Sequence, residues 1–422
     1  MAFYLCVLIN IILCSAYLFP FGFTVLPAGV NTKIAMAAIG LFFVLRDMKK
    51  SLDIPVFLVG VVVLGGVFSC IGLFSVFYNE TSDYAYATYI ISMLVWLSAA
   101  YTFVLSVARI HGYVSLRLIV NYLVAVCVLQ CMLALVIAYY LPFKHLVDTY
   151  ILQVAADTDF LNEVDRLYGI GAAVDPAGVR FAAVLVLMSV ILNIDPDLPS
   201  ATLVLYVSSF LIIIAVGNLI SRTTIVGAAL GIAYLISSSG ILTFRIRSRG
   251  LAISGVLAIG AVLLFAIGYF LYVNVEDVRE LLRYGFEGFF NWVEKGEWTT
   301  SSTEKLNTMW VYPDNLKTWV IGDGLFTDPF GKGYYMYTDI GYLRFVFYCG
   351  VIGLFLFCLF FIYVVRMLSG LFPAYRIAFF LLLFLGFLVW VKVSTDLFQF
   401  YALFLTLATC PVQYKNRKIR ML

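Results

Sequence analysis

Twelve apolar segments recur along this chain, and each has about the length that crosses a lipid bilayer as an α-helix. A spanning helix needs about 20 mostly apolar residues, because the hydrocarbon offers no water to pair with backbone N–H and C=O groups. The segments cover residues 3–20, 28–46, 54–78, 84–108, 117–141, 176–193, 200–217, 219–238, 251–273, 339–365, 376–391 and 395–412. This pattern predicts an all-α polytopic membrane protein with about twelve transmembrane helices.

The composition agrees with lipid as the main solvent of the chain. Hydrophobic residues make up 63% and charged residues 12%, whereas soluble proteins have about 45–50% and about 25%. All eight cysteines lie in apolar segments, which supports neither a disulfide framework nor a cysteine metal site. The two histidines, His111 and His145, are far apart in sequence. We therefore expect no metal, no cofactor and no nucleic-acid partner.

The distribution of basic residues predicts the orientation of the segments. If the N-terminus is cytoplasmic, the cytoplasmic loops follow the even-numbered segments, and five of those six loops carry Arg or Lys clusters. The exception is the acidic turn Asp195-Pro196-Asp197 after the sixth segment. The outward loops include the two longest, and both are rather acidic. We therefore expect both chain termini to be cytoplasmic.

A long outward loop at residues 274–338 divides the chain into three parts. Residues 1–273 are expected to contain transmembrane helices one to nine. Residues 339–422 are expected to contain helices ten to twelve and a basic cytoplasmic tail. The loop between them is the largest part of the chain that is predicted to lie outside the membrane, in the extracytoplasmic (periplasmic) space.

The long loop is itself predicted to be helical. Apolar residues from Glu276 to Lys295 recur at i, i+3, i+4 and i+7, which predicts one amphipathic helix. Ser301-Ser302-Thr303-Glu304 predicts a capping box for a second short helix, and Asp314 the start of another turn. Four of the six tryptophans lie here, at Trp292, Trp298, Trp310 and Trp319. They are expected either to form an interfacial belt and the small core of the loop, or to stack on sugar faces.

Three arginines fall at the starts of predicted membrane helices that begin on the outer side: Arg180, Arg222 and Arg344. An arginine on a membrane helix is costly unless it reaches the headgroups or finds a partner. Each one alone can reach the headgroups. Three at one level, with no carboxylates nearby in sequence except Asp175 and Asp339, favour a shared anion site instead. Guanidinium groups are planar and donate in pairs, so a diphosphate is the expected ligand.

Asp339 lies five residues before Arg344, a spacing that does not place the two side chains on one helix face. We expect Asp339 to point towards the loop and Arg344 to face the bundle. A carboxylate in this place can act as a general base towards a sugar hydroxyl. It also suits the N-cap of the tenth helix. The two roles are compatible, and both stay open at this point.

Several short motifs follow one another in a set order along the second half of the chain. They are Ala177-Gly178-Val179-Arg180-Phe181, Ser221-Arg222-Thr223, Thr308-Met309-Trp310, Ile321-Gly322-Asp323-Gly324, Thr338-Asp339-Ile340-Gly341-Tyr342-Leu343 and Gly350-Val351-Ile352-Gly353. This arrangement, with a long outer loop before the third-last helix, resembles the bacterial O-antigen polymerase and ligase superfamily. The first half of the chain resembles that family only in hydropathy.

The resemblance implies a metal-independent, GT-C-like membrane glycosyltransferase in the bacterial cytoplasmic (inner) membrane. Its substrates would be undecaprenyl-diphosphate-linked glycans at the outer face. The resemblance implies catalytic roles for Asp339 and Arg344, and substrate or diphosphate contacts for Arg180, Arg222, Lys305, Trp310 and Tyr342. Lys305 stands where loops of the family often carry an arginine.

A polymerase that joins repeat units of O-antigen lipopolysaccharide or a related surface polysaccharide is the favoured function. A polysaccharide chain-length regulator is a candidate partner. The alternative within the family is a ligase that transfers finished glycan to a lipid A core. Ligases are expected to carry a histidine near the position of Asp339, and this loop has none. A polysaccharide transporter or flippase is the alternative from another class. The unusual charges at one level and the large asymmetric loop speak against transport.

Overall fold

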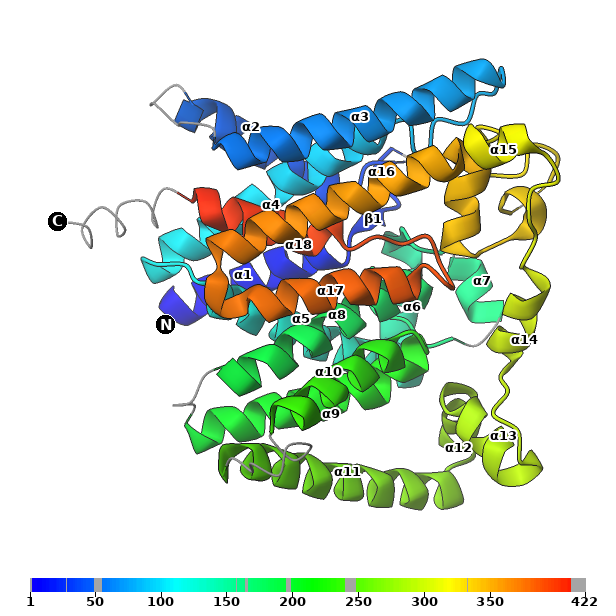
Figure 1. The fold of residues 1–422 in the computed structure, drawn as a ribbon. Helices are drawn as coiled ribbons and strands as arrows, with labels where there is room; N and C mark the ends of the chain where they lie inside the picture. The colour runs from blue at the N-terminus through cyan, green and yellow to red at the C-terminus, as the bar shows by residue number, and fades with distance from the viewer. Residues whose placement is uncertain are drawn as a thin grey trace. The chain divides into compact units, whose positions relative to one another are not determined.

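A computed structural model describes residues 2–27, 29–48, 55–156, 158–163, 166–194, 199–239, 248–331 and 333–410. These ranges are mostly helical, and seven of their helices are long and apolar enough to cross a membrane (Figure 1). The seven are α3 (Val56–Tyr78), α4 (Tyr89–His111), α5 (Leu116–Tyr139), α8 (Val174–Ile194), α9 (Ser200–Ile220), α11 (Ser248–Asn274) and α16 (Gly341–Leu371). The protein is therefore a helical multi-pass membrane protein.

The other five apolar segments also form helices, but shorter ones of 12 to 17 residues. They are α1 (Ala2–Leu18), α2 (Thr32–Met48), α10 (Thr224–Ser238), α17 (Arg376–Val389) and α18 (Phe398–Thr409). At about 1.5 Å per residue these helices extend roughly 18–26 Å, less than a hydrocarbon core of about 30 Å. The helical nature of all twelve segments is confirmed, whereas twelve membrane crossings stay a prediction.

Several residues that predicted the orientation lie outside the described ranges. They are Lys49, Lys50, Asp195, Pro196, Asp197, Arg245, Arg247 and the basic tail at 415–420. The cytoplasmic placement of both termini therefore stays a prediction.

The chain divides into two compact units. Unit 1 consists of Met1–Ala35 and Leu105–Trp298, and unit 2 of Met36–Val104 and Thr299–Leu422. The long loop predicted at 274–338 therefore contributes its first part to unit 1 and the rest to unit 2.

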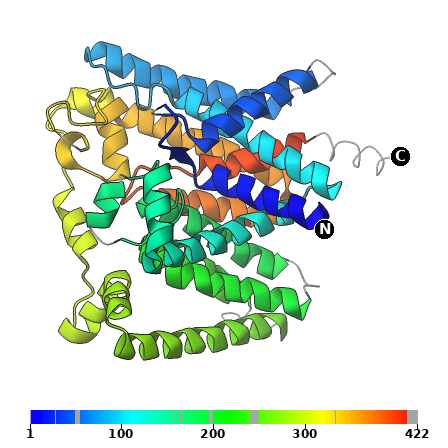
Figure 2. The ribbon, with the colours of Figure 1, turned by 180° about the vertical axis from the view of Figure 1, so that it is seen from behind.

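Unit 1 is built around α8, which lies side by side with α5, α9 and α10 (Figures 1 and 2). Every residue from Ala177 to Leu192 is buried, as expected for a helix that is apolar all round. Gly227 lets α10 approach closely, because a Cβ there would lie 2.3 Å from the Cα of Ala182. One end of this unit carries a two-stranded antiparallel sheet, β1 (Phe21–Phe23) and β2 (Ile151–Gln153). It also carries the short helices α6 and α7, at 141–150 and 158–163.

Unit 2 is built around α16, which packs against α3, α17 and α18 (Figure 1). The helix kinks at Cys349 and Gly350, where Gly350 has a φ of 67°. A Cβ at Gly350 would lie 2.0 Å from the carbonyl oxygen of Val320, the last residue of α15 (Leu316–Val320). Only glycine permits this conformation and this close approach. The kink thus seats α15 directly against α16.

The first part of the long loop differs from the prediction. The single amphipathic helix expected from Glu276 to Lys295 is two helices, α12 (Glu276–Gly285) and α13 (Glu287–Lys295). Phe286 separates them with a φ of −114° and a ψ of 29°. The apolar periodicity continues across the break, so the pattern alone could not show it.

Helix capping in the loop is also shifted from the prediction. Thr300 caps α14 (Ser301–Thr308), and Thr303 completes the capping box by bonding back to the Thr300 backbone N–H. The side chain of Asn315, not that of Asp314, caps α15. Each helix therefore begins one residue away from the position that the sequence suggested.

Candidate functional site

Arg344 and Asp339 form a charged pair at the start of α16 in unit 2. Nη1 of Arg344 lies 3.5 Å from Oδ1 of Asp339. The guanidinium carbon of Arg344 also lies 3.7 Å from the ring centroid of Phe326 and 3.4 Å from that of Tyr334. A carboxylate and two aromatic rings thus compensate a cation that is only 5% exposed.

The expectation that Asp339 and Arg344 point apart is therefore wrong. The helix begins at Gly341, so Asp339 belongs to the preceding extended segment, where helix spacing does not apply. The N-cap role expected for Asp339 is also wrong. Ile340 occupies the N-cap position, and no side chain caps this helix. The carboxylate is 33% exposed, so it remains accessible to a substrate.

One edge of the Arg344 guanidinium lacks hydrogen-bond acceptors. Nε and Nη2 are buried and have no partner among the described residues. A buried donor without an acceptor costs about 1–3 kcal/mol. Nε–H and Nη2–H project side by side, and this edge is the donor pair that binds two oxygens of a phosphate or carboxylate. The geometry therefore suits an anionic ligand at this edge.

Asp83, before α4, holds the loop segment that covers Arg344. Its Oδ2 accepts hydrogen bonds from the backbone N–H groups of Phe326 and Thr327 and from the Thr327 hydroxyl, each at 2.9 Å. The Tyr348 hydroxyl donates to the Asp83 carbonyl oxygen at 2.6 Å. Asp83 thereby fixes the residue whose ring contacts Arg344. Local sequence patterns do not reveal Asp83 as a functional residue, because its partners lie more than 240 positions away.

A second set of polar contacts fixes the Gly322-Asp323-Gly324 motif. Lys317 donates to Oδ1 of Asp323 at 2.8 Å and to Oδ1 of Asn79 at 2.5 Å. The Asn79 amide donates in turn to the carbonyl oxygen of Gly322 at 3.1 Å. The Tyr335 hydroxyl reaches Oδ2 of Asp323 at 3.4 Å. Burial raises the pKa of Tyr335, and the Asp323 carboxylate raises it further. The motif therefore orders the loop.

Two predicted substrate contacts of unit 2 differ in how accessible they are. The Tyr342 hydroxyl donates to the carbonyl oxygen of Phe387 at 2.8 Å, and its ring packs edge-on against Trp390. Both contacts lie within the protein, so the ring and the hydroxyl of Tyr342 are already engaged in packing. Lys305 is exposed on α14, so its side chain can move towards a ligand.

Trp310 belongs to a row of aromatic rings in the long loop. Its ring centroid lies 6.3 Å from that of Tyr312, which stacks on Trp319 at 6.4 Å and 15°. Trp310 is 40% exposed. A row of this kind serves as a small core for the loop, and its exposed end can stack on a sugar. Both expected roles of the tryptophan stay open.

Arg180 and the turn after α9 lie together in unit 1. Oδ1 of Asp175, at the start of α8, accepts hydrogen bonds from the hydroxyls of Ser221 at 3.1 Å and Thr223 at 2.6 Å. Arg180 follows on the same helix and is 9% exposed, with its guanidinium carbon 5.6 Å from the Phe19 ring centroid. Asp175 thus joins the two arginine-bearing motifs of this unit.

Arg222, in that turn, contacts the first part of the long loop. Its Nη1 lies 2.7 Å from Oε2 of Glu287, and its guanidinium carbon lies 4.4 Å from the ring centroid of Tyr284. Arg166 lies 5.7 Å from the same ring. Glu287 is far from Arg222 in the sequence, so it was not among the carboxylates expected near the three arginines, Asp175 and Asp339. Arg166 and Tyr284 were not predicted as site residues, because they meet only through the tertiary fold.

The expected anion site draws on both units. Arg180 and Arg222 belong to unit 1, and Asp339 and Arg344 to unit 2. Their convergence on one ligand stays a prediction. In the ranges that the structure describes, no three His, Cys, Asp or Glu side chains are grouped to hold a metal ion.

Comparisons with models of known protein families, with curated proteins and with solved structures find no match. The resemblance to O-antigen polymerases and ligases therefore rests on the sequence motifs, and family membership stays a prediction.

Proposed function

We propose that the protein is a membrane glycosyltransferase that polymerises oligosaccharide repeat units carried on undecaprenyl diphosphate. The product would be O-antigen or a related surface polysaccharide, made at the outer face of the bacterial cytoplasmic membrane. The observation that carries the proposal is the buried Nε and Nη2 edge of Arg344 beside the accessible carboxylate of Asp339. One group suits a diphosphate, and the other suits a sugar hydroxyl.

The two groups match the two requirements of the transfer. The oxygen of the acceptor hydroxyl forms a bond to the anomeric carbon of the donor, and the carbon–oxygen bond to the diphosphate breaks. Its electron pair stays on the diphosphate, where Arg344 stabilises the developing charge. The proton of the acceptor hydroxyl passes to Asp339 as general base. Bond formation and bond cleavage are thus each assisted by one member of the pair.

Arg180 and Arg222, in unit 1, are candidates for further diphosphate contacts. A polymerase handles two diphosphate-linked lipids, the donor and the acceptor, so it needs more than one basic group. Arg180 and Arg222 have the planar donor geometry that phosphate oxygens prefer. Because Arg222 is paired with Glu287, a bound diphosphate would replace that carboxylate as its partner.

Complementation of a deletion strain tests the proposal. Arg344→Ala is expected to abolish long-chain glycan and to leave single repeat units on undecaprenyl diphosphate outside the membrane. Arg283→Ala is the matched control, because Arg283 is an exposed loop arginine paired with Glu294. The control is expected to keep wild-type polymer. Normal long chains in an Arg344→Ala variant that reaches the membrane in wild-type amount would refute the assignment. Long chains that accumulate on the carrier lipid would indicate a ligase.

A further inference from the structure

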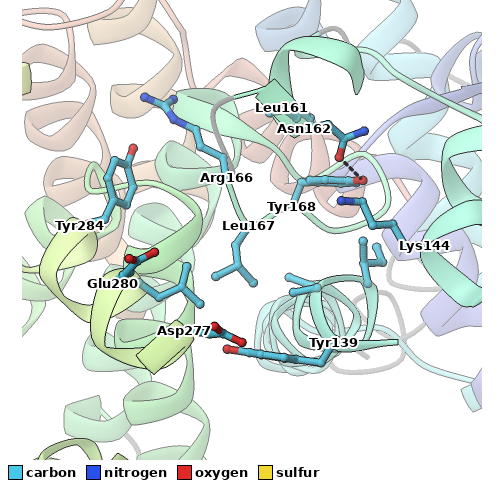
Figure 3. A pocket seen from close by; sticks show the side chains of 14 residues that line it. Tyr139, Lys144, Leu161, Asn162, Arg166, Leu167, Tyr168, Asp277, Glu280 and Tyr284 are labelled. Atoms are coloured by element: carbon cyan, nitrogen blue, oxygen red, sulfur yellow. Dashed lines mark hydrogen bonds between the residues drawn. The ribbon is translucent and has the colours of Figure 1, made fainter. Parts of the chain in front are cut away.

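Unit 1 contains a cavity of about 440 Å³ near Tyr284 (Figure 3). It is lined by the end of α5, by the segment that follows α5 and by the first helix of the long loop, α12. Its volume is in the range of small-molecule sites, which is about 300–1,000 Å³. The floor is apolar and buried, with Ile137, Leu161 and Leu167 among its residues. The rim is polar.

One wall of the cavity is a single face of α12. Asp277, Glu280, Leu281 and Tyr284 line it, and their spacing of i, i+3, i+4 and i+7 places them on one side of the helix. Figure 3 shows the carboxylates of Asp277 and Glu280 at separate places along this wall, with that of Asp277 beside the Tyr139 hydroxyl. This wall thus offers two hydrogen-bond acceptors and one aromatic ring.

The opposite wall supplies hydrogen-bond donors and further aromatic rings. Lys144, Asn162, Tyr168 and Tyr139 line it. The Tyr168 hydroxyl donates to Oδ1 of Asp148 at 2.6 Å, which fixes the ring in place. Tyrosine presents an apolar face together with a polar edge. Such rings alternate with carboxylate, amide and ammonium groups around this cavity.

This lining suits a ligand with many hydroxyl groups and some apolar C–H surface. Carboxylates accept strong hydrogen bonds from hydroxyls, and aromatic faces pack on C–H groups. Two carboxylates, Asp277 and Glu280, and two cations, Lys144 and Arg166, line the cavity, so its formal charges balance. Arg166, which lines the cavity, and Arg222, which does not, both lie by the ring of Tyr284. Tyr284 therefore both lines the cavity and contacts Arg222.

We propose that this cavity is a saccharide-binding pocket that takes sugar residues of the lipid-linked repeat unit, with Asp277 and Glu280 accepting hydrogen bonds from sugar hydroxyls. The inference rests on the proposed function, because that function supplies a glycan next to a diphosphate. A diphosphate held by Arg222 would leave its attached sugar on the cavity side of Tyr284.

Binding measurements on the full-length protein in lipid nanodiscs test the pocket. The probes are the oligosaccharide repeat unit freed from its lipid, followed by saturation-transfer NMR, and undecaprenyl diphosphate without sugar. The double variant Asp277→Asn, Glu280→Gln keeps the side-chain shapes and removes both charges. We expect it to bind the free oligosaccharide at least about tenfold more weakly. Its affinity for undecaprenyl diphosphate is expected to equal that of the wild type.

Glu276→Gln is the matched control, because Glu276 is an exposed acid of the same helix that does not line the cavity. It is expected to bind both probes as the wild type does. The proposal of a saccharide pocket would be overturned if the double variant bound the oligosaccharide as tightly as the wild type. It would also be overturned if the wild-type protein did not bind the oligosaccharide. Polymer formation with either result would leave the polymerase assignment intact. A third outcome separates the two proposals: the wild type binds the oligosaccharide but makes no polymer, and the double variant does not bind it. That outcome would support the saccharide pocket and refute the polymerase.

Discussion

Nη1 of Arg344 lies 3.5 Å from Oδ1 of Asp339, while the opposite edge of the same guanidinium has no acceptor among the described residues. The pair therefore combines a satisfied side, which orients the cation, with a side that can donate to a ligand. Phe326 and Tyr334 hold the group in place.

Asp339→Asn tests the role of this carboxylate. If Asp339 takes the proton of the acceptor hydroxyl, we expect the polymerisation rate to fall about 10²–10⁴-fold, with KM little changed. Asn keeps the shape and can still accept a hydrogen bond from Arg344, so a purely orienting role predicts near-normal turnover. Asp339→Glu is expected to restore part of the rate. Steady-state kinetics on lipid-linked repeat units separate the two roles.

Arg344→Lys tests the donor edge. Lysine keeps the charge but loses the fixed pair of N–H groups. Hydrogen bonds to charged groups contribute about 1.5–3 kcal/mol each, so the affinity for undecaprenyl diphosphate is expected to fall about 10- to 100-fold. Arg283→Lys is the control for a loop arginine and is expected to change nothing. Equal affinities of the Arg344→Lys protein and the wild type, by calorimetry in nanodiscs, would contradict the role of the edge.

Asp83→Ala tests how the loop is held over Arg344. Three hydrogen bonds from Phe326 and Thr327 lose their acceptor, so residues 322–334 are expected to become sensitive to limited proteolysis. The polymerisation rate of the Asp83→Ala protein is also expected to fall. Glu80→Ala, at an exposed acid of the same connection, is expected to leave both unchanged, and Asp83→Asn to restore protection in part. An unchanged cleavage pattern in Asp83→Ala would contradict the role of Asp83 in holding this loop segment.

The raised pKa of Tyr335 predicts that unit 2 loses stability at alkaline pH. Burial and then Asp323 raise its pKa above the ordinary value of 10.0. The unfolded chain therefore loses the phenolic proton first, and the contribution of Tyr335 to stability declines as pH rises from about 10 through the folded-state pKa. We expect Tm to fall between about pH 9 and about pH 11, and to fall less in Tyr335→Phe. An identical fall in both proteins would show that other groups cause it.

Local patterns in the sequence predicted the helices, but not the contacts between distant residues. The apolar segments are helical as expected, because about 20 consecutive apolar residues are a strong local signal. The break at Phe286 and the cap at Thr300 depend on local geometry that the apolar period does not encode. Glu287 beside Arg222 is a consequence of tertiary folding alone. Motif spacing selected Asp339 and Arg344 as candidate site residues, but it did not predict their approach to one another.

The most direct test of the central claim is polymerisation by the purified full-length protein in nanodiscs. The only substrate supplied is the repeat unit on undecaprenyl diphosphate. We predict a ladder of longer lipid-linked glycans, with one undecaprenyl diphosphate released for each bond formed. The Arg344→Ala protein is predicted to form no ladder. Absence of a ladder with the wild-type protein, or an equal ladder with the Arg344→Ala protein, would contradict the account.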